Sequence, residues 1–236
     1  ACDHPYFPVR AGAVWQRTRG TGPRTWTVTA VEGDLNSAEA TVTDSSDTTT
    51  LTYLWRCTAA GLSYFRLEDV SRLAAALLTF YSTVDSAHAT DSSADIAQIR
   101  LAVSDQAGVS LPAELQPGAE WTHRYTVRSE ARPAAAPDAY SLSTLEVSET
   151  HTAGAAETLT TAAGPFTVIP VSVQAVTVYT YEFFADMPGI PKVGPNTDTY
   201  ASRTTLYYAL GVGLVRSEWA SGENGVVSEL ETFRLP

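Results

Sequence analysis

The chain has 236 residues, with 26 acidic against 15 basic side chains and a formal net charge of −11. Its 44% of apolar and 17% of charged residues are typical of a folded globular protein and argue against long-range disorder. A pI near 4.7 argues against a duplex nucleic-acid surface, because phosphate binding needs clustered basic side chains, and no apolar run is long enough to cross a bilayer as a helix.

Alternating apolar and polar residues, rich in Thr, Val and aromatics, predict β-strands along most of the chain. A Gly-containing turn at 32–34 joins the first predicted hairpin, and a turn at 222–225 joins the last. The predicted strands cover residues 25–31, 37–43, 49–56, 121–128, 140–149, 168–173, 175–184, 204–217 and 225–235. Strands at short intervals without alternating helices indicate a mainly β, antiparallel fold, built as a curved sheet or incomplete barrel.

One stretch departs from the strand pattern. Residues 67–78 place apolar side chains at 70, 73, 74, 77 and 78, which is the spacing of an amphipathic helix. A buried strand over residues 74–81 is the competing interpretation, because Thr79, Phe80 and Tyr81 favour strands. The polar, Ser- and Asp-rich residues 84–97 predict a mobile loop. The expected fold is therefore mainly β with one or two short helices.

The chain contains an internal repeat. Gly12 precedes Trp15 by three residues, and Gly118 precedes Trp121 by the same spacing, each pair following a proline. Glycine adopts a positive φ without steric cost, so each glycine is expected in a turn that directs its tryptophan into the core. We expect two related β-halves, residues 1–110 and 111–236, packed together as one unit.

Four segments carry motifs that occur together in one group of proteins: residues 6–15, 55–62, 157–166 and 209–218. They resemble uncharacterised bacterial envelope lipoproteins, in which a PAG-x-F turn and a GVG-hydrophobic-V hairpin lie in the second half. The chain departs from that pattern at Ala162, where proline is usual, and at Pro165, where a small polar residue is usual. The resemblance implies an incomplete β-barrel like that of lipoprotein carriers and lipid-binding lipoproteins, and it transfers no catalytic residue.

The amino terminus suggests a location outside the cytoplasm. Ala1-Cys2-Asp3 resembles the junction at which a lipoprotein signal peptide is removed and the following cysteine is acylated, so Cys2 is a candidate lipid-attachment site that anchors the protein on the cell envelope. The alternative is a disulfide between Cys2 and Cys57 in a secreted protein. The two predictions exclude each other at Cys2, and two free thiols are the third alternative.

Candidate catalytic chemistry is sparse. The four histidines share no metal-ligand spacing: His4, His88, His123 and His151. On a strand, His123 would share the face of Trp121, and a structural role is the favoured interpretation. The sequence contains no Gly-x-Ser-x-Gly elbow, phosphate loop or dinucleotide fingerprint. We therefore predict no catalytic residue, no metal site and no cofactor.

Aromatic side chains are numerous and have two interpretations. They could fill a core between sheet and helix, or some could line a concave sheet face that binds an apolar ligand. Alternation along residues 175–184 places Val176 and Val178 on one face and Tyr179 and Tyr181 on the other. The candidate ligand face comprises Trp15, Trp55, Trp121, Tyr179, Tyr181 and Phe183.

Three functions are compatible with these observations. The leading prediction is a non-catalytic envelope lipoprotein that binds an apolar ligand or a lipidated partner. The alternative is a structural or accessory subunit of an envelope or surface protein complex. A secreted hydrolase is the third, although the sequence offers no convergent acid, base and nucleophile.

Overall fold

The fold consists entirely of β-strands in the part of the chain that the computed structural model describes. The described residues are 2–19, 22–34, 36–46, 50–64, 96–133, 139–185, 193–221 and 224–236. Within them, no helix is of a length and apolar character that would span a membrane. The predicted helix at 67–78 lies outside the described residues, and so does residue range 84–95 of the predicted mobile loop.

The strands fall into an N-terminal and a C-terminal series. The first series comprises β1 (Asp3–His4), β2 (Phe7–Pro8), β3 (Val14–Arg19), β4 (Gly22–Gly33), β5 (Ser37–Ser45), β6 (Thr50–Thr58) and β7 (Gly61–Ser63). The second comprises β8 (Ile96–Gly108), β9 (Leu111–Pro112), β10 (Glu120–Pro133), β11 (Ala139–Ala153), β12 (Glu157–Thr161), β13 (Gly164–Ala185), β14 (Val193–Ala209), β15 (Gly213–Ser221) and β16 (Asn224–Arg234).

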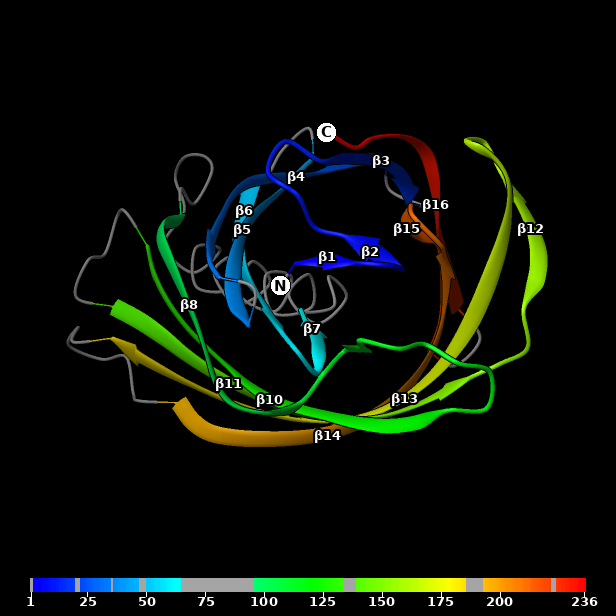
Figure 1. Cartoon of the computed structure of the whole chain (residues 1–236). Helices are drawn as coiled ribbons and strands as arrows, with labels where there is room; N and C mark the ends of the chain where they lie inside the picture. The colour runs from blue at the N-terminus through cyan, green and yellow to red at the C-terminus, as the bar shows by residue number, and fades with distance from the viewer. Residues whose placement is uncertain are drawn as a thin grey trace.

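One large antiparallel sheet contains all strands except β1 and β2, in the order β8-β10-β11-β13-β14-β15-β16-β3-β4-β5-β6-β7-β9, with β12 paired to β13. The last strand, β16, pairs with β3, so the C-terminal strand joins the two series. Figure 1 shows the sheet curled around the small β1–β2 hairpin. The predicted mainly β, antiparallel, curved architecture is confirmed.

The sheet is not closed, but its two ends come together at one corner, which we call the seam. Its first strand β8 and last strand β9 do not pair with each other and are separated in the chain only by Val109 and Ser110. Ser110 Oγ accepts a hydrogen bond from the Tyr64 N–H and donates one to the Tyr64 carbonyl, both at 2.9 Å. These bonds attach the connection between β8 and β9 to the residue that follows β7, beside the two-residue pairing of β7 with β9.

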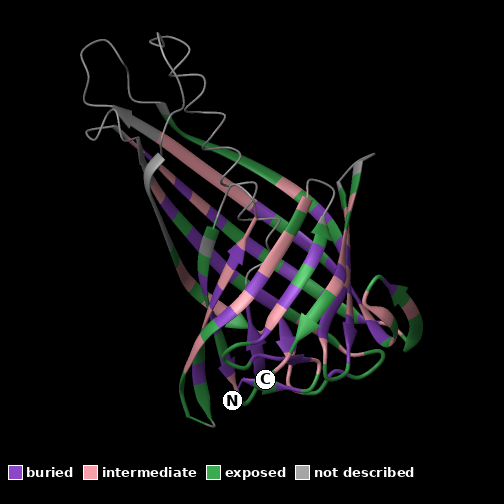
Figure 2. Cartoon of the chain, turned by 90° about the horizontal axis from the view of Figure 1, so that it is seen from above, coloured by how far each residue is buried: buried purple, intermediate pink, exposed green. Residues whose placement is uncertain are grey.

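Inner and outer faces alternate along the strands, as Figure 2 shows by the alternating buried and exposed bands. The inner face of β3, β4 and β6 presents Trp15, Trp26 and Trp55, which are 1%, 5% and 2% exposed. Phe7 of β2 lies among them, stacked on Trp15 at a ring-centroid distance of 5.1 Å and 5.3 Å from Trp55. The small hairpin thus fills this part of the interior with aromatic rings.

Two predicted strand boundaries are wrong. Residues 168–173 and 175–184 belong to one strand, β13, since Gln174 simply takes an outward position in the alternation. Residues 204–217 form the end of β14 and most of β15, because Gly211 at φ 72° makes a turn between them. The final predicted hairpin is confirmed as β15 and β16, with Ser221 paired to Asn224.

The two Gly-x-x-Trp segments have matching turns. Gly12 and Gly118 have φ values of 88° and 82°. The Gly12 N–H donates to the Val28 carbonyl, and the Gly118 N–H donates to that of Ala153, both at 2.8 Å. Trp15 is buried, whereas Trp121 is only partly buried against the core. The local turn geometry is as predicted; the duplication and the two-half division stay predictions.

Candidate functional site

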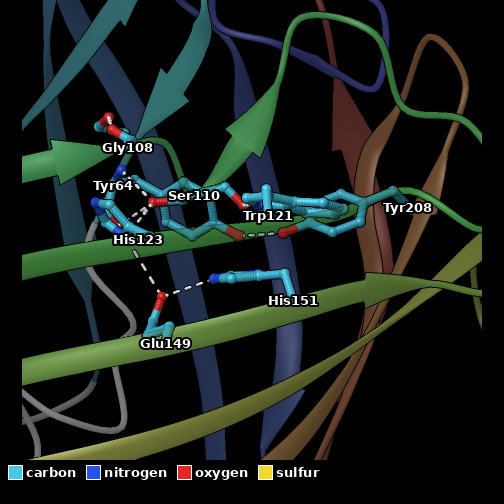
Figure 3. Close-up of polar contacts among 9 residues, drawn as sticks. Tyr64, Gly108, Ser110, Trp121, His123, Glu149, His151 and Tyr208 are labelled. Atoms are coloured by element: carbon cyan, nitrogen blue, oxygen red, sulfur yellow. Dashed lines mark hydrogen bonds and ion pairs between the residues drawn. The ribbon is translucent and has the colours of Figure 1, made fainter.

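A buried cluster of ionisable side chains lies on the inner face of β10 and β11, next to the seam. His123 of β10 is directly opposite Glu149 of β11 in the antiparallel register, and Trp121 is opposite His151. Because side chains alternate along a strand, Glu149 and His151 share one face, and the cross-strand pairing brings His123 to the same place. Figure 3 shows the three side chains converging.

One carboxylate oxygen lies between the two imidazoles. Glu149 Oε2 is 3.3 Å from His123 Nδ1 and 3.0 Å from His151 Nε2. His123, Glu149 and His151 are 0%, 3% and 2% exposed. The other ring nitrogens, His123 Nε2 and His151 Nδ1, are buried without a hydrogen-bond partner among the described residues.

Aromatic rings and the seam hold the cluster in place. His151 stacks on Trp121 with ring centroids 5.1 Å apart and an interplanar angle of 18°, and His123 lies 4.9 Å from the Tyr125 ring. Ser110 Oγ is 3.2 Å from His123 Nδ1. Tyr64, bonded to Ser110, also shares a hydroxyl–hydroxyl hydrogen bond with Tyr208 of β14 (Figure 3).

This arrangement offers three donor atoms to a metal ion. Two histidines and one glutamate form the ligand set of several zinc sites, and one donor atom from each residue lies within 4.8 Å of the others. Sequence spacing missed the cluster, since His123 is separated from Glu149 by 26 residues. The available signal was Glu149-x-His151, a same-face pair if the strand predicted over 140–149 continues by two residues, but strand register is needed to add His123.

The predicted ligand-face residues whose side chains the structure describes lie in three places. Trp15 and Trp55 are buried beside Phe7 in the aromatic core. Trp121 stacks on His151, and Tyr179 and Tyr181 stack on each other at 5.4 Å farther along β13. Phe183 lies in β13, and its side chain is outside the described set.

The inner face around Tyr179 is polar. Ser143 Oγ and Tyr179 Oη form a hydrogen bond of 3.3 Å, and burial raises the pKa of the Tyr179 hydroxyl above its ordinary value. Small hydroxyl side chains on neighbouring strands are also buried: Ser129, Ser141, Ser143, Thr177, Ser202 and Thr204. The inward face of β10, β11, β13 and β14 therefore carries more buried hydroxyl groups among its apolar side chains than the tryptophan-rich face of β3, β4 and β6.

A hollow of about 590 Å³ lies on the opposite, outward face of the same strands. Arg124 and Arg203 contribute to it together with Thr150, Gln174 and Val176, all of which are exposed. This surface mixes charged and polar side chains with small apolar ones and contains none of the aromatic residues of the predicted apolar site.

Cys2 and Cys57 form a disulfide that spans 55 residues of sequence. This bond is the alternative that the sequence left open. Its Cys2 sulfur cannot also carry a thioether-linked lipid, so lipid attachment at Cys2 requires a form of the protein without this disulfide. His4, two residues farther on, donates through Nε2 to the Pro112 carbonyl at 2.7 Å and ties this end of the chain to β9.

No protein-family model and no curated protein sequence matches the chain. Among solved structures, a protein from Bacteroides fragilis described as exported and as having a YmcC-like fold is similar, with a TM-score of 0.53 and 15% sequence identity over 98% of this chain and 100% of that chain. A protein from Parabacteroides distasonis described as a lipoprotein has a TM-score of 0.49 and 16% identity, over 98% of this chain and 99% of its own. The first likeness shows a shared fold.

Proposed function

We propose that this protein is a non-catalytic protein of the bacterial cell envelope that binds an apolar or amphipathic ligand, or a lipidated partner, outside the cytoplasm. The observation that carries the location is the Cys2–Cys57 disulfide, because structural disulfides persist in oxidising compartments and are rare in the cytosol. The similar fold of a protein described as exported supports the same location.

Burial supports a non-catalytic role. The three most reactive clustered side chains, His123, Glu149 and His151, are at most 3% exposed. A catalytic acid or base must come within hydrogen-bonding distance of a substrate, and an enclosed cluster on the inner sheet face does not offer that approach.

The residues proposed to contact the ligand are aromatic side chains outside the packed core. Tyr179 and Tyr181 are partly buried, stacked on each other and inward-facing. A tyrosine pair offers apolar ring faces together with hydroxyl groups, which suits an amphipathic molecule such as a fatty acid. We do not assign this role to Trp15 and Trp55, because both are buried in the core.

Location and the state of Cys2 are tested together. We expect the protein, expressed with an export signal and fractionated from its host, to occur outside the cytoplasm with an intact mass two protons below that of the reduced chain. An added acyl mass at Cys2 would instead support the lipid anchor, which stays a prediction. A cytoplasmic protein with two free thiols would refute the proposed location.

Ligand binding is tested with a fluorescent fatty acid and phospholipid vesicles. Tyr181→Ala is expected to weaken binding about five- to tenfold, since one aromatic contact contributes on the order of 1–1.5 kcal/mol. Tyr207→Ala is the matched control, because Tyr207 lies on the outward side of β14 with its hydroxyl donating to Glu218. Absence of binding to both probes would refute the ligand part without affecting the location.

The accessory-subunit alternative rests on a different observation, the outward hollow lined by Arg124 and Arg203. A partner protein with an acidic surface would fit there. Crosslinking in intact cells, with Arg124→Glu/Arg203→Glu as the comparison, separates this function from ligand binding: loss of a specific crosslinked complex supports it, and a wild-type protein without any such complex opposes it.

A further inference from the structure

We infer that His123, Glu149 and His151 form a binding site for one divalent transition-metal ion of the zinc class, adjacent to the seam of the sheet. This site is independent of the proposed ligand-binding function. The inference rests on the convergence of three donor atoms from two paired strands, on their distances and on their chemistry.

The distances agree with a metal polyhedron. Zinc lies about 2.0–2.1 Å from nitrogen and oxygen ligands, so two ligand atoms at a tetrahedral site are separated by about 3.3 Å. Glu149 Oε2 is 3.3 Å from His123 Nδ1 and 3.0 Å from His151 Nε2. Two edges of a tetrahedron are thus present, and all three donors lie within 4.8 Å of one another.

Strand geometry explains why the donors converge. Residues i and i+2 of a strand project from one face, and the residue directly opposite on an antiparallel neighbour completes a triangle. Glu149 and His151 are the first two, and His123 is the third. The stacking of His151 on Trp121 restricts its ring orientation, so the donors are held before an ion binds.

The donor chemistry indicates the class of ion. Two nitrogen donors and one oxygen donor select zinc, cobalt or nickel over calcium and magnesium, which prefer all-oxygen sites.

The nearby Ser110 hydroxyl is a candidate for a fourth ligand. Ser110 Oγ is 3.2 Å from His123 Nδ1 but already bonds the Tyr64 backbone twice. A water molecule is therefore the expected fourth ligand. An ion at this position would crosslink β10 and β11 beside the seam, so its binding should stabilise the fold.

The test uses the full-length chain without a histidine tag, stripped with a chelator and titrated with ZnCl₂ and CoCl₂. We expect one ion per chain, visible d–d absorption of tetrahedral Co²⁺, and a rise in Tm of roughly 5–10 °C at a zinc concentration 100-fold above Kd. Crystals soaked in zinc should give an anomalous peak between His123, Glu149 and His151.

Glu149→Gln keeps the size and hydrogen-bonding shape of the side chain but removes the charged ligand. It should weaken zinc binding more than about 100-fold, since even outer-shell changes cost 10- to 100-fold. His4→Gln is the matched control, because His4 is a buried histidine outside the cluster, and it should leave zinc binding unchanged. If Glu149→Gln does not fold, His151→Gln and the anomalous peak of the wild type replace it.

If the cluster is only a hydrogen-bonded network that binds no metal ion, the opposite results are expected. Zinc would then leave Tm unchanged, Co²⁺ would give no tetrahedral spectrum, and the soaked crystals would show no peak at the cluster. Co²⁺ absorption that persists in Glu149→Gln would place the ion elsewhere and overturn the inference equally.

Discussion

Two inner faces of one sheet differ in what they bury. On β3, β4 and β6 the interior holds tryptophans packed around Phe7. On β10, β11, β13 and β14 it holds histidine, glutamate and hydroxyl side chains together with buried aliphatic and tyrosine side chains such as Val127, Leu145 and Tyr208. The same alternation of inward and outward residues therefore produces an aromatic region rich in tryptophan and a region that mixes polar with apolar side chains, which we call the polar region.

The two regions are expected to differ in how much they contribute to stability and to binding. Burying a large apolar side chain contributes about 1.5–3 kcal/mol, whereas a buried polar group costs free energy unless it is hydrogen bonded. The aromatic region buries the largest rings, and the polar region also retains buried ionisable and hydroxyl residues that stability alone does not favour. Such residues concentrate where a protein binds something, which is why both proposals concern the polar region.

Phe7→Ala should have the largest effect. The ring is fully buried among Trp15, Trp26, Trp55 and Tyr64, and its removal leaves a cavity that these rings cannot fill. We expect a loss of about 3–5 kcal/mol in the free energy of unfolding, measured by urea denaturation. Phe233→Ala, at a residue 38% exposed, is the control and should cost far less. Equal losses would contradict an aromatic core centred on Phe7.

Removing the disulfide should rank second. A crosslink across 55 residues restricts the unfolded chain, so Cys2→Ala/Cys57→Ala should lower the free energy of unfolding by about 2–5 kcal/mol. Reducing agent should lower the Tm of the wild type to a similar degree and leave that of the double variant unchanged. A wild type insensitive to reductant would mean that the bond does not form.

His4 should make this end of the molecule sensitive to acid. Desolvation lowers the pKa of its imidazole below the ordinary value, against the opposing effect of the hydrogen bond to Pro112. The unfolded chain then binds the proton more tightly, so the stabilisation is complete above the unfolded pKa of about 6.5 and declines as pH falls through it.

His4→Gln should therefore cost about 1–2 kcal/mol at pH 8, where the native hydrogen bonds are intact, and less at pH 5. Chemical denaturation of both proteins across pH 5–8 measures the difference. A difference that grows toward pH 5 would show that His4 is stabilised in its charged form instead.

Substitutions of buried serines in the polar region should have the smallest effect on the free energy of unfolding. Ser129 Oγ and Ser141 Oγ are buried without a hydrogen-bond partner among the described residues. Ser129→Ala/Ser141→Ala should leave the free energy of unfolding unchanged or raise it by up to about 1 kcal/mol, because an unsatisfied hydroxyl is removed. Ser143→Ala, which loses the bond to Tyr179, is the comparison and should be mildly destabilising. A loss above about 1 kcal/mol in the double variant would contradict the division between the two regions.

The strands were predicted correctly from the sequence where the turns between them have clear sequence signals. The hairpin predicted over residues 25–43 is present as β4 and β5, and the face shared by Tyr53 and Trp55 is buried. Gly211 was assigned to a strand because its neighbours are apolar, but its positive φ turns the chain. Local composition does not distinguish a glycine turn between apolar residues from a strand that contains glycine.

The candidate site residues also show that local sequence patterns do not reveal contacts between distant segments. Trp15 and Trp55 have the aromatic character expected of a ligand face, yet the β1–β2 hairpin carries Phe7 between them and makes them core. His123 was expected to be structural, and only the register of β10 with β11 brings it to Glu149. Both outcomes depend on which distant segment lies opposite, and sequence spacing does not contain that information.

The sequence by itself determined the antiparallel β class, the alternation that assigns side chains to two faces, and the positive-φ turns at Gly12 and Gly118, because these depend on neighbouring residues. The tertiary structure decided the pairing of β16 with β3, the approach of the sheet's two ends at the seam beside Ser110, the disulfide partner of Cys2, and the convergence of His123, Glu149 and His151. Each of these joins segments far apart in the chain, where the free energy depends on packing and register.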